Sequence, residues 1–112
     1  KKVQAAIQAD QVRVSSPSAA DLYAPSVDRL FQTASEACAD RLLAVVLTGM
    51  GDDGARAIRQ VRDRGGRTIA ESEESAIIFG MPGEAIRTGA VEAVLPLRDI
   101  PHAIRRLCAG KG

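Results

Sequence analysis

The amino-acid sequence predicts an α/β fold, a doubly wound and mainly parallel sheet flanked by helices in three layers. The first observation is a continuous branched-aliphatic run over residues 42–47, which is typical of a strand covered on both faces. The second is that segments with β character alternate with segments whose apolar residues recur at helical spacing, without internal repeats. The length of 112 residues fits one domain or part of one.

Residues 1–24 show only a modest pattern. Short alternating runs on either side of Ala9 and Asp10 predict two strands joined by a turn within residues 3–15. Small, polar and proline-containing residues then predict a loop over residues 15–21. We assign residues 1–24 to strands and a loop, without a function.

A helix is predicted to begin behind Pro25 and Ser26, which together provide a start and a cap. Apolar residues at helical spacing form its one buried stripe: Val27, Leu30, Phe31, Ala34 and Cys38.

A strand, helix and strand follow in order. The strand is the apolar run of residues 42–47. The helix ends at Gly65 and Gly66, and its buried positions are Ala55, Ile58 and Val61. Residues 67–70 resume a β pattern, so this part of the chain predicts a parallel strand pair with a helical crossover.

The C-terminal third is less uniform. Residues 75–80 contain Ile77, Ile78 and Phe79 and fit either a strand or a buried helix, which periodicity cannot separate at that length. Residues 82–88 predict a short helix stopped by a glycine, and residues 91–95 predict a strand. A final amphipathic helix is predicted to end at Gly110, with the apolar residues Ile100, Ala103, Ile104, Leu107 and Cys108.

Composition argues against several classes of function. Fifteen basic and fourteen acidic residues nearly cancel, and the aromatic residues are only two Phe and one Tyr, which argues against nucleic acid as a partner. No apolar run approaches the ~20 residues of a membrane-spanning helix, so no membrane insertion is expected. Arginines in and after the second helix are interpreted as a solvated face: Arg56, Arg59, Arg62 and Arg67.

The two cysteines, Cys38 and Cys108, lie far apart in helical patterns. They lack the spacing of a metal or redox pair and are interpreted as buried residues of a reduced, cytoplasmic protein. We therefore expect no metal ion and no cofactor. The chain begins at Lys1 rather than methionine, and we expect it to be excised from a longer polypeptide.

The glycine-rich segment after residues 42–47 allows three interpretations. Its G-x-G-x-x-G spacing, with Glu71 about where a ribose-binding acid would fall, fits a dinucleotide site formed by Gly49, Gly51 and Gly54. However, Asp52 and Asp53 would repel a pyrophosphate at the helix terminus. In the second interpretation, one of these acids caps the following helix, which stabilises that helix by ~1 kcal/mol. In the third, one of them orients a histidine for catalysis.

Three motifs in this chain resemble one family. They are LTGMGDDGA at residues 47–55, PSVDRLF at residues 25–31 and FGMPGEAI at residues 79–86. In this order they resemble the CheB-type protein-glutamate methylesterases of bacterial chemotaxis. The resemblance extends over roughly residues 24–107, and we assign residues 25–112 to the C-terminal part of a methylesterase catalytic domain.

The resemblance implies a hydrolase with a Ser-His-Asp triad. Such an enzyme demethylates glutamyl methyl esters on the cytoplasmic signalling helices of methyl-accepting chemotaxis receptors and deamidates certain glutamines there. The triad aspartate corresponds to Asp53, which would hold the imidazole in the correct tautomer. Met50 corresponds to the residue whose backbone lines the oxyanion side of the site, and Gly49 and Gly51 would allow close approach to a tetrahedral intermediate.

The same resemblance places the nucleophilic serine and the base histidine in upstream segments that these 112 residues do not contain. The single histidine, His102, follows Pro101 in the terminal helix and is predicted to face solvent or to cap that helix. Ser26 is interpreted as a helix cap, and Ser72 and Ser75 as loop residues.

We therefore expect the chain to be inactive by itself and to need the N-terminal half of its own catalytic domain. Its other expected partner is the receptor signalling helix. A non-catalytic, receptor-binding relic of the same fold is the main alternative, and a dinucleotide-binding domain is the third.

Overall fold

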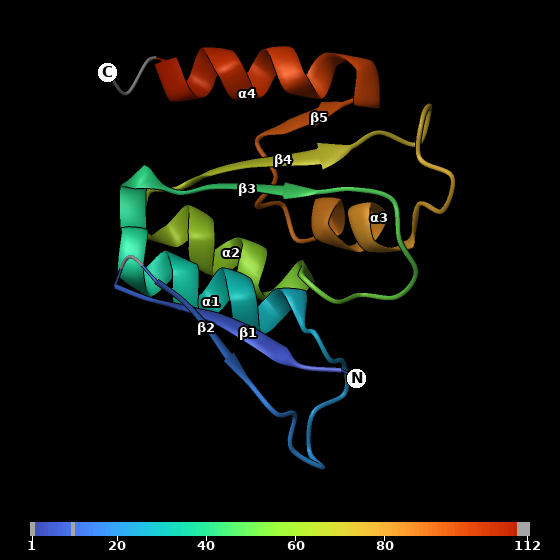
Figure 1. Ribbon diagram of the computed structural model, residues 1–112. Coiled ribbons are helices and arrows are strands. Elements are labelled where there is room, and N and C mark those ends of the chain that lie inside the picture. Colours follow the sequence, from blue (N-terminus) through green and yellow to red (C-terminus); the bar gives the residue numbers. More distant parts are fainter. Residues whose placement is uncertain (1, 10, 110–112) are drawn as a thin grey trace.

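The computed structural model describes residues 2–9 and 11–109, which form a three-stranded parallel sheet, a two-stranded antiparallel sheet and helices on both faces of the former. In Figure 1, α4 lies on one side of the parallel sheet and α2 and α3 lie on the other. Helix α1 packs against α2, and the antiparallel hairpin packs against α1. The predicted three-layer α/β class is confirmed.

The parallel sheet consists of β3 (Leu43–Val46), β4 (Arg67–Glu71) and β5 (Ala93–Leu95), in that spatial order. Val45 is paired with Ile69, and Ile69 is paired with Ala93. Successive side chains of a strand point to opposite faces, so β3 contributes to the packing on both sides of the sheet.

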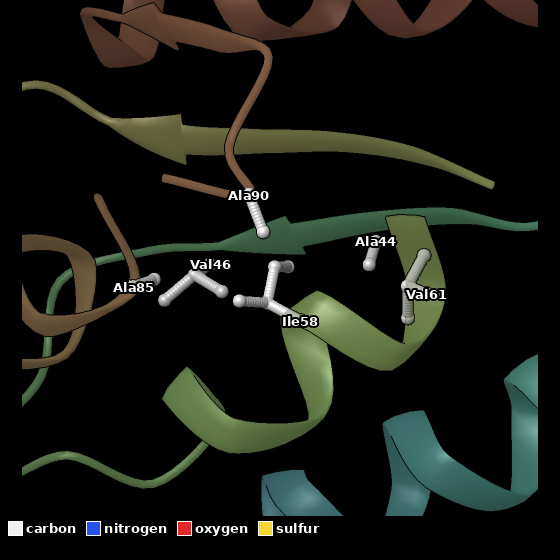
Figure 2. Close-up of a cluster of buried hydrophobic side chains, with 6 residues drawn as sticks. All are labelled: Ala44, Val46, Ile58, Val61, Ala85 and Ala90. Carbon is white, nitrogen blue, oxygen red and sulfur yellow. The ribbon is translucent and has the colours of Figure 1, made fainter. Parts of the chain in front are cut away.

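One face is covered by α2 (Ala55–Asp63) and α3 (Gly80–Arg87). Figure 2 shows Ile58 of α2 pointing toward β3, where the buried cluster is formed by Ala44, Val46, Ile58, Val61, Ala85 and Ala90. Ile58 is completely buried. Burial of such a side chain contributes about 1.5–3 kcal/mol, so this cluster fixes α2 on the sheet.

The opposite face is covered by α4 (Ile100–Ala109), which follows the short 3-10 helix η2 (Leu97–Asp99). Its buried residues Ile100 and Ala103 contact Ile69, and the partly buried Leu43 and Val45 pack against them. Alternate residues of β3 therefore enter two separate clusters. This confirms the prediction of a strand covered on both faces.

Helix α1 (Val27–Cys38) is followed by the short 3-10 helix η1 (Ala39–Arg41). It begins directly after Ser26, whose Oγ accepts a hydrogen bond from the Arg29 amide at 3.1 Å. The predicted cap is confirmed.

The hairpin consists of β1 (Gln4–Gln8) and β2 (Gln11–Ser15), as the alternating pattern predicts. The amide of Ile7 donates to Thr33 Oγ1 at 2.8 Å and ties β1 to α1. Asp10 of the predicted turn lies outside the described residues, as does Gly110 at the predicted end of α4.

Residues 75–80 form neither of the two structures that their apolar content allowed. They lie in turns until α3 begins at Gly80, and Phe79 makes an isolated parallel bridge with Gly49. Ile77 is 90% exposed. The reason is that Thr48 Oγ1 accepts the Ile78 amide at 2.8 Å and donates to its carbonyl at 3.1 Å, which holds the segment as a loop against the end of β3.

The cysteine prediction is wrong in one respect. Cys108 is exposed and Cys38 is only partly buried, because the stripes that include them reach the ends of their helices. The arginine prediction is closer, since Arg56, Arg59 and Arg62 are exposed. Arg67 and Arg62 form ion pairs with Glu92 at 2.8 and 3.4 Å.

Candidate active site

The glycine-rich loop between β3 and α2 lies at the carboxyl edge of the parallel sheet, where ligands of such folds bind. The amide of Gly49 donates to the Ile78 carbonyl at 2.9 Å, and the Met81 amide donates to the Gly49 carbonyl at 2.8 Å. A Cβ at Gly80 would lie only 2.9 Å from the Gly49 carbonyl oxygen. The start of α3 therefore needs a glycine to contact this loop.

Asp53 is buried in this loop, with 5% of its surface exposed. Its Oδ2 accepts the Val27 amide at 2.7 Å, and its Oδ1 accepts the Asp28 amide at 2.8 Å and the Ser26 hydroxyl at 3.3 Å. The carboxylate thus caps the N-terminus of α1, a helix distant from it in sequence.

The structure corrects the simple capping interpretation. The N-cap residue of α2 is Gly54, which has the left-handed conformation with φ 101° and, as a glycine, offers no side-chain acceptor to the helix. Neither Asp52 nor Asp53 caps the helix that follows it. Instead, Asp28 in the first turn of α1 accepts the Ala57 amide of α2 at 2.8 Å.

The Asp53 carboxylate has further acceptor capacity. An ionised carboxylate presents about four lone-pair positions, and the structure uses three of them. Among the residues that the structure describes, the Oδ2 atom accepts one hydrogen bond, from Val27. A rigid carboxylate with one acceptor position remaining is what an orienting acid beside an imidazole requires.

Met50 lies at the tip of the loop, with 73% of its surface exposed. Within residues 2–9 and 11–109, the amides of Met50 and Gly51 donate no hydrogen bond, whereas the amide of Gly49 is already used. Gly51 has φ 86°, a conformation that favours glycine. Two adjacent amides are therefore available to an anion at this edge. Gly49 contributes no donor, but its lack of a side chain allows Met81 to pack close, because a Cβ there would lie 2.7 Å from Met81 Sδ.

Glu71 at the end of β4 is 2% exposed. Its Oε1 accepts the Thr48 amide at 2.9 Å, and its Oε2 accepts the Ser75 hydroxyl at 2.7 Å. The Ser75 oxygen in turn accepts the Leu97 amide at 2.8 Å. Glu71 thus joins three segments at the sheet edge, and its oxygens do not face a ligand as a ribose-binding acid would.

Tyr23 borders the loop from the other side. Its hydroxyl donates to Asp52 Oδ1 at 3.1 Å, and this hydrogen bond to a carboxylate raises the pKa of Tyr23 above its ordinary value of 10.0. Tyr23 and Asp52 also line a hollow of about 470 Å³ at the N-termini of α1 and α2, together with Arg29 and Arg56.

The remaining sequence candidates lie elsewhere. His102 is exposed in the first turn of α4, on the face of the sheet opposite α2, so the solvent-facing prediction is confirmed. Ser72 and Ser75 lie in the loop after β4, as expected. No described helix is long and apolar enough to cross a membrane.

Sequence reasoning missed Gln4, Tyr23 and Gly80 and did not anticipate what Asp28 and Glu71 contact. The position of Asp28 in the first turn of α1 predicts an interaction with its own helix, and gives no indication that it accepts the Ala57 amide of α2. The roles of Gln4 and Tyr23 depend on contacts between distant segments, which no local pattern reveals.

The chain is similar in sequence and in structure to proteins of one family. A sequence model of the CheB methylesterase family matches residues 1–104. Protein-glutamate methylesterase/protein-glutamine glutaminase 1 of Myxococcus xanthus is 53% identical over 91 residues, which are 81% of this chain and 26% of that protein. The protein-glutamate methylesterase FrzG of Myxococcus xanthus is 49% identical over 82 residues, which are 73% of this chain and 25% of that protein.

Among solved structures, the CheB methylesterase catalytic domain of Thermotoga maritima superposes with a TM-score of 0.82 at 33% identity. The match covers 95% of this chain and 57% of that domain. This chain therefore spans about a quarter of the curated relatives and just over half of the solved domain. The family match and the shared fold together show that the chain belongs to the CheB methylesterase family.

Proposed function

We propose that this chain supplies the acid and the oxyanion-binding loop of a protein-glutamate methylesterase that also deamidates glutamine. The substrates are glutamyl methyl esters and glutamines on the cytoplasmic signalling helices of methyl-accepting chemotaxis receptors. The activities named for its relatives, protein-glutamate methylesterase and protein-glutamine glutaminase, support this assignment. The nucleophilic serine and the base histidine come from a segment outside these 112 residues, the N-terminal half of the catalytic domain.

The observation that carries the proposal is the environment of Asp53. Its carboxylate is buried, held by two backbone amides and one hydroxyl, and retains an acceptor position at the carboxyl edge of the sheet. The carboxylate lies at the N-terminus of α1, where it accepts the amides of Val27 and Asp28. A carboxylate fixed in this way holds a histidine in one tautomer and stabilises the imidazolium that forms during catalysis.

The reaction proceeds in two steps. The serine oxygen attacks the ester carbonyl while the histidine takes the hydroxyl proton, and Asp53 accepts the hydrogen bond of the other imidazole nitrogen. The tetrahedral intermediate collapses to an acyl-serine and methanol, which receives the proton from the histidine. Water then attacks the acyl-serine with the same groups, releasing the glutamate carboxylate and the serine. A glutamine substrate follows the same course with ammonia as the leaving group.

The Met50 loop stabilises the negative oxygen of each tetrahedral intermediate. The amides of Met50 and Gly51 are the donors for this role, because both are unpaired within the described residues. Removal of one such donor typically costs about 10²–10³ in kcat, so the loop contributes a large part of the rate.

The test uses the full-length gene product and a methylated receptor, with methanol release as the readout. Asp53→Asn is expected to lower kcat by about 10⁴, the loss that the same change causes in a serine-protease triad. The exposed Asp63 at the end of α2 provides the matched control, since Asp63→Asn leaves the loop intact. Full activity of the Asp53→Asn enzyme, confirmed as folded by circular dichroism, would contradict the proposal.

A second measurement addresses the chain by itself. With the only histidine exposed on α4, residues 1–112 are expected to release methanol no faster than buffer. Histidine-dependent activity sensitive to a serine reagent in pure material would overturn the assignment of the triad to two segments.

The alternative is a receptor-binding relic without catalysis. It is favoured by the fact that Asp53 caps α1, a structural task that remains when chemistry is lost. A full-length protein that binds receptor but releases no methanol, and whose upstream part lacks the serine, would support this alternative. The dinucleotide interpretation gains no support, because both Glu71 oxygens are occupied by protein donors.

A further inference from the structure

Gln4 is a polar residue with only 1% of its surface exposed. Its Nε2 donates to the Tyr23 carbonyl at 2.7 Å, and its Oε1 accepts the Ser26 amide at 2.8 Å. Both ends of the amide are thus used to bridge the turn that leads into α1. A buried amide with both groups satisfied specifies one geometry for the backbone that it bridges.

The strand that carries Gln4 is itself anchored. Gln4 is paired with Ser15 in the hairpin, and the Ile7 amide donates to Thr33 on α1 at 2.8 Å. The position of Gln4 relative to α1 is therefore fixed from both sides of β1. This gives residues 1–24 a direct connection to the candidate site.

The side chain of Tyr23 continues this connection into the loop. Its hydroxyl donates to Asp52 at 3.1 Å. A Cβ built on Gly51 would lie 2.9 Å from the same hydroxyl, which shows how closely the ring borders the loop. Gly51 carries one of the two proposed oxyanion donors, and Asp52 directly precedes the acid Asp53, so Tyr23 contacts the loop at both of these positions.

We propose that Tyr23 is a positioning residue for the loop of residues 49–54 and that Gln4 fixes Tyr23 in place from β1. Tyr23 does not touch the reacting atoms. It sets the distance between the Met50 amide and the Asp53 carboxylate through its contacts with Gly51 and Asp52. The inference rests on the proposed function, because the geometry that it protects is that of the triad acid and the oxyanion donors.

The first experiment measures backbone hydrogen exchange by mass spectrometry on the full-length gene product. Tyr23→Phe removes only the hydroxyl, and Gln4→Leu removes both ends of the amide bridge. Each is expected to speed exchange in peptides that contain Val27 and Asp28, because their amides are bound by the Asp53 carboxylate. The matched control is Gln8→Leu, the same substitution at an exposed position of β1.

The expected pattern is faster exchange at the start of α1 in both variants and no change there in Gln8→Leu. Unchanged exchange in Tyr23→Phe would overturn the proposal, whatever the activity of the protein. If Gln4→Leu fails to fold, Tyr23→Phe decides alone, because a phenyl ring occupies the same space.

The second experiment separates positioning from simple stability. Tyr23→Phe is expected to lower kcat by about tenfold with KM unchanged, within the loss of about 10² that a displacement of about 1 Å causes. Equal kcat in the Tyr23→Phe and unmodified enzymes would refute the role of Tyr23. If the unmodified protein shows no activity at all, the proposed function fails, while the exchange experiment still decides whether Tyr23 holds the loop.

Discussion

Asp28 and Asp53 cap each other's helices. The Asp53 carboxylate accepts the amide of Asp28 at 2.8 Å in the first turn of α1, and the Asp28 carboxylate accepts the Ala57 amide at 2.8 Å in the first turn of α2. Each acid therefore lies at the positive end of a helix dipole other than that of the helix next to it in sequence. The N-termini of α1 and α2 are held together by this exchange, and the loop between β3 and α2 is held with them.

The first prediction concerns Asp28. Asp28→Ala is expected to lower the free energy of unfolding by about 1–3 kcal/mol, because the buried Ala57 amide loses its acceptor. Asp28→Asn retains an acceptor oxygen and should lose less. The exposed Asp63→Ala provides a control, with a change within about 0.5 kcal/mol. Urea unfolding measures all three, and equal stability of Asp28→Ala and Asp63→Ala would show that the cap contributes nothing.

A second prediction tests the buried carboxylate of Glu71. Glu71→Ala leaves the Thr48 amide and the Ser75 hydroxyl without an acceptor, and we expect a loss of about 2–4 kcal/mol. Glu71→Gln keeps an oxygen for Thr48 and should cost about 1 kcal/mol or less. The control is Glu74→Ala, because Glu74 forms only an exposed ion pair with Arg98 at 3.0 Å. A loss in Glu71→Ala no larger than in this control would contradict the assignment.

The third prediction compares two isoleucines of opposite exposure. Ile58 is completely buried between α2 and β3, whereas Ile77 is 90% exposed. Ile58→Ala should lower the free energy of unfolding by about 2–5 kcal/mol, because the substitution leaves a cavity in the core. Ile77→Ala should change stability by less than about 0.5 kcal/mol. Thermal and urea unfolding check both, and similar losses in the two variants would contradict the packing of Figure 2.

The fourth prediction concerns pH. Tyr23 is the only tyrosine of the chain, which has no tryptophan, so ultraviolet absorbance of tyrosinate reports this residue alone. The hydrogen bond to the Asp52 carboxylate raises the pKa of Tyr23 above 10.0, and removal of that charge in Asp52→Asn should bring the pKa back toward 10.0. The Asp63→Asn variant should titrate like the unmodified chain. An unshifted pKa in Asp52→Asn would mean that the Tyr23–Asp52 contact is absent in solution.

The raised pKa of Tyr23 also determines how the free energy of unfolding changes with pH. A group whose pKa is higher in the folded than in the unfolded state binds its proton more tightly when folded. The contribution of Tyr23 is therefore fully present below the ordinary pKa of 10.0 and is lost as pH rises through the raised pKa. Unfolding curves above pH 10.0 should show a smaller loss of stability for Tyr23→Phe than for the unmodified chain.

The sequence predicted the elements whose signal is local. The apolar run at residues 42–47 was sufficient for a strand buried on both faces, because period and composition decide that outcome together. The segment around Ile77 and Ile78 was ambiguous, because apolar content alone does not show whether the chain has a surface to pack on. There the bonds to Thr48 fix a loop, and they join residues far apart in sequence.

In the candidate site, too, local signals are visible in the sequence and contacts between distant segments are not. The motif makes Asp53 a candidate catalytic acid, which stays a prediction, but the use of its oxygens at the start of α1 is evident only from the tertiary structure. Gln4 carries no local signal, because its two partners lie on a different segment of the chain. The contacts that position a loop are therefore the part of a site that a single sequence conceals.

The capping role of Asp53 has a consequence for how related sequences evolve. A residue that stabilises the fold is retained by selection on stability even after the reaction is abandoned. Family members that have lost the serine or the histidine are therefore expected to keep this aspartate, and its presence in a sequence does not by itself identify a working esterase. For inferring activity, the proposed nucleophile and base are therefore more informative positions than this aspartate.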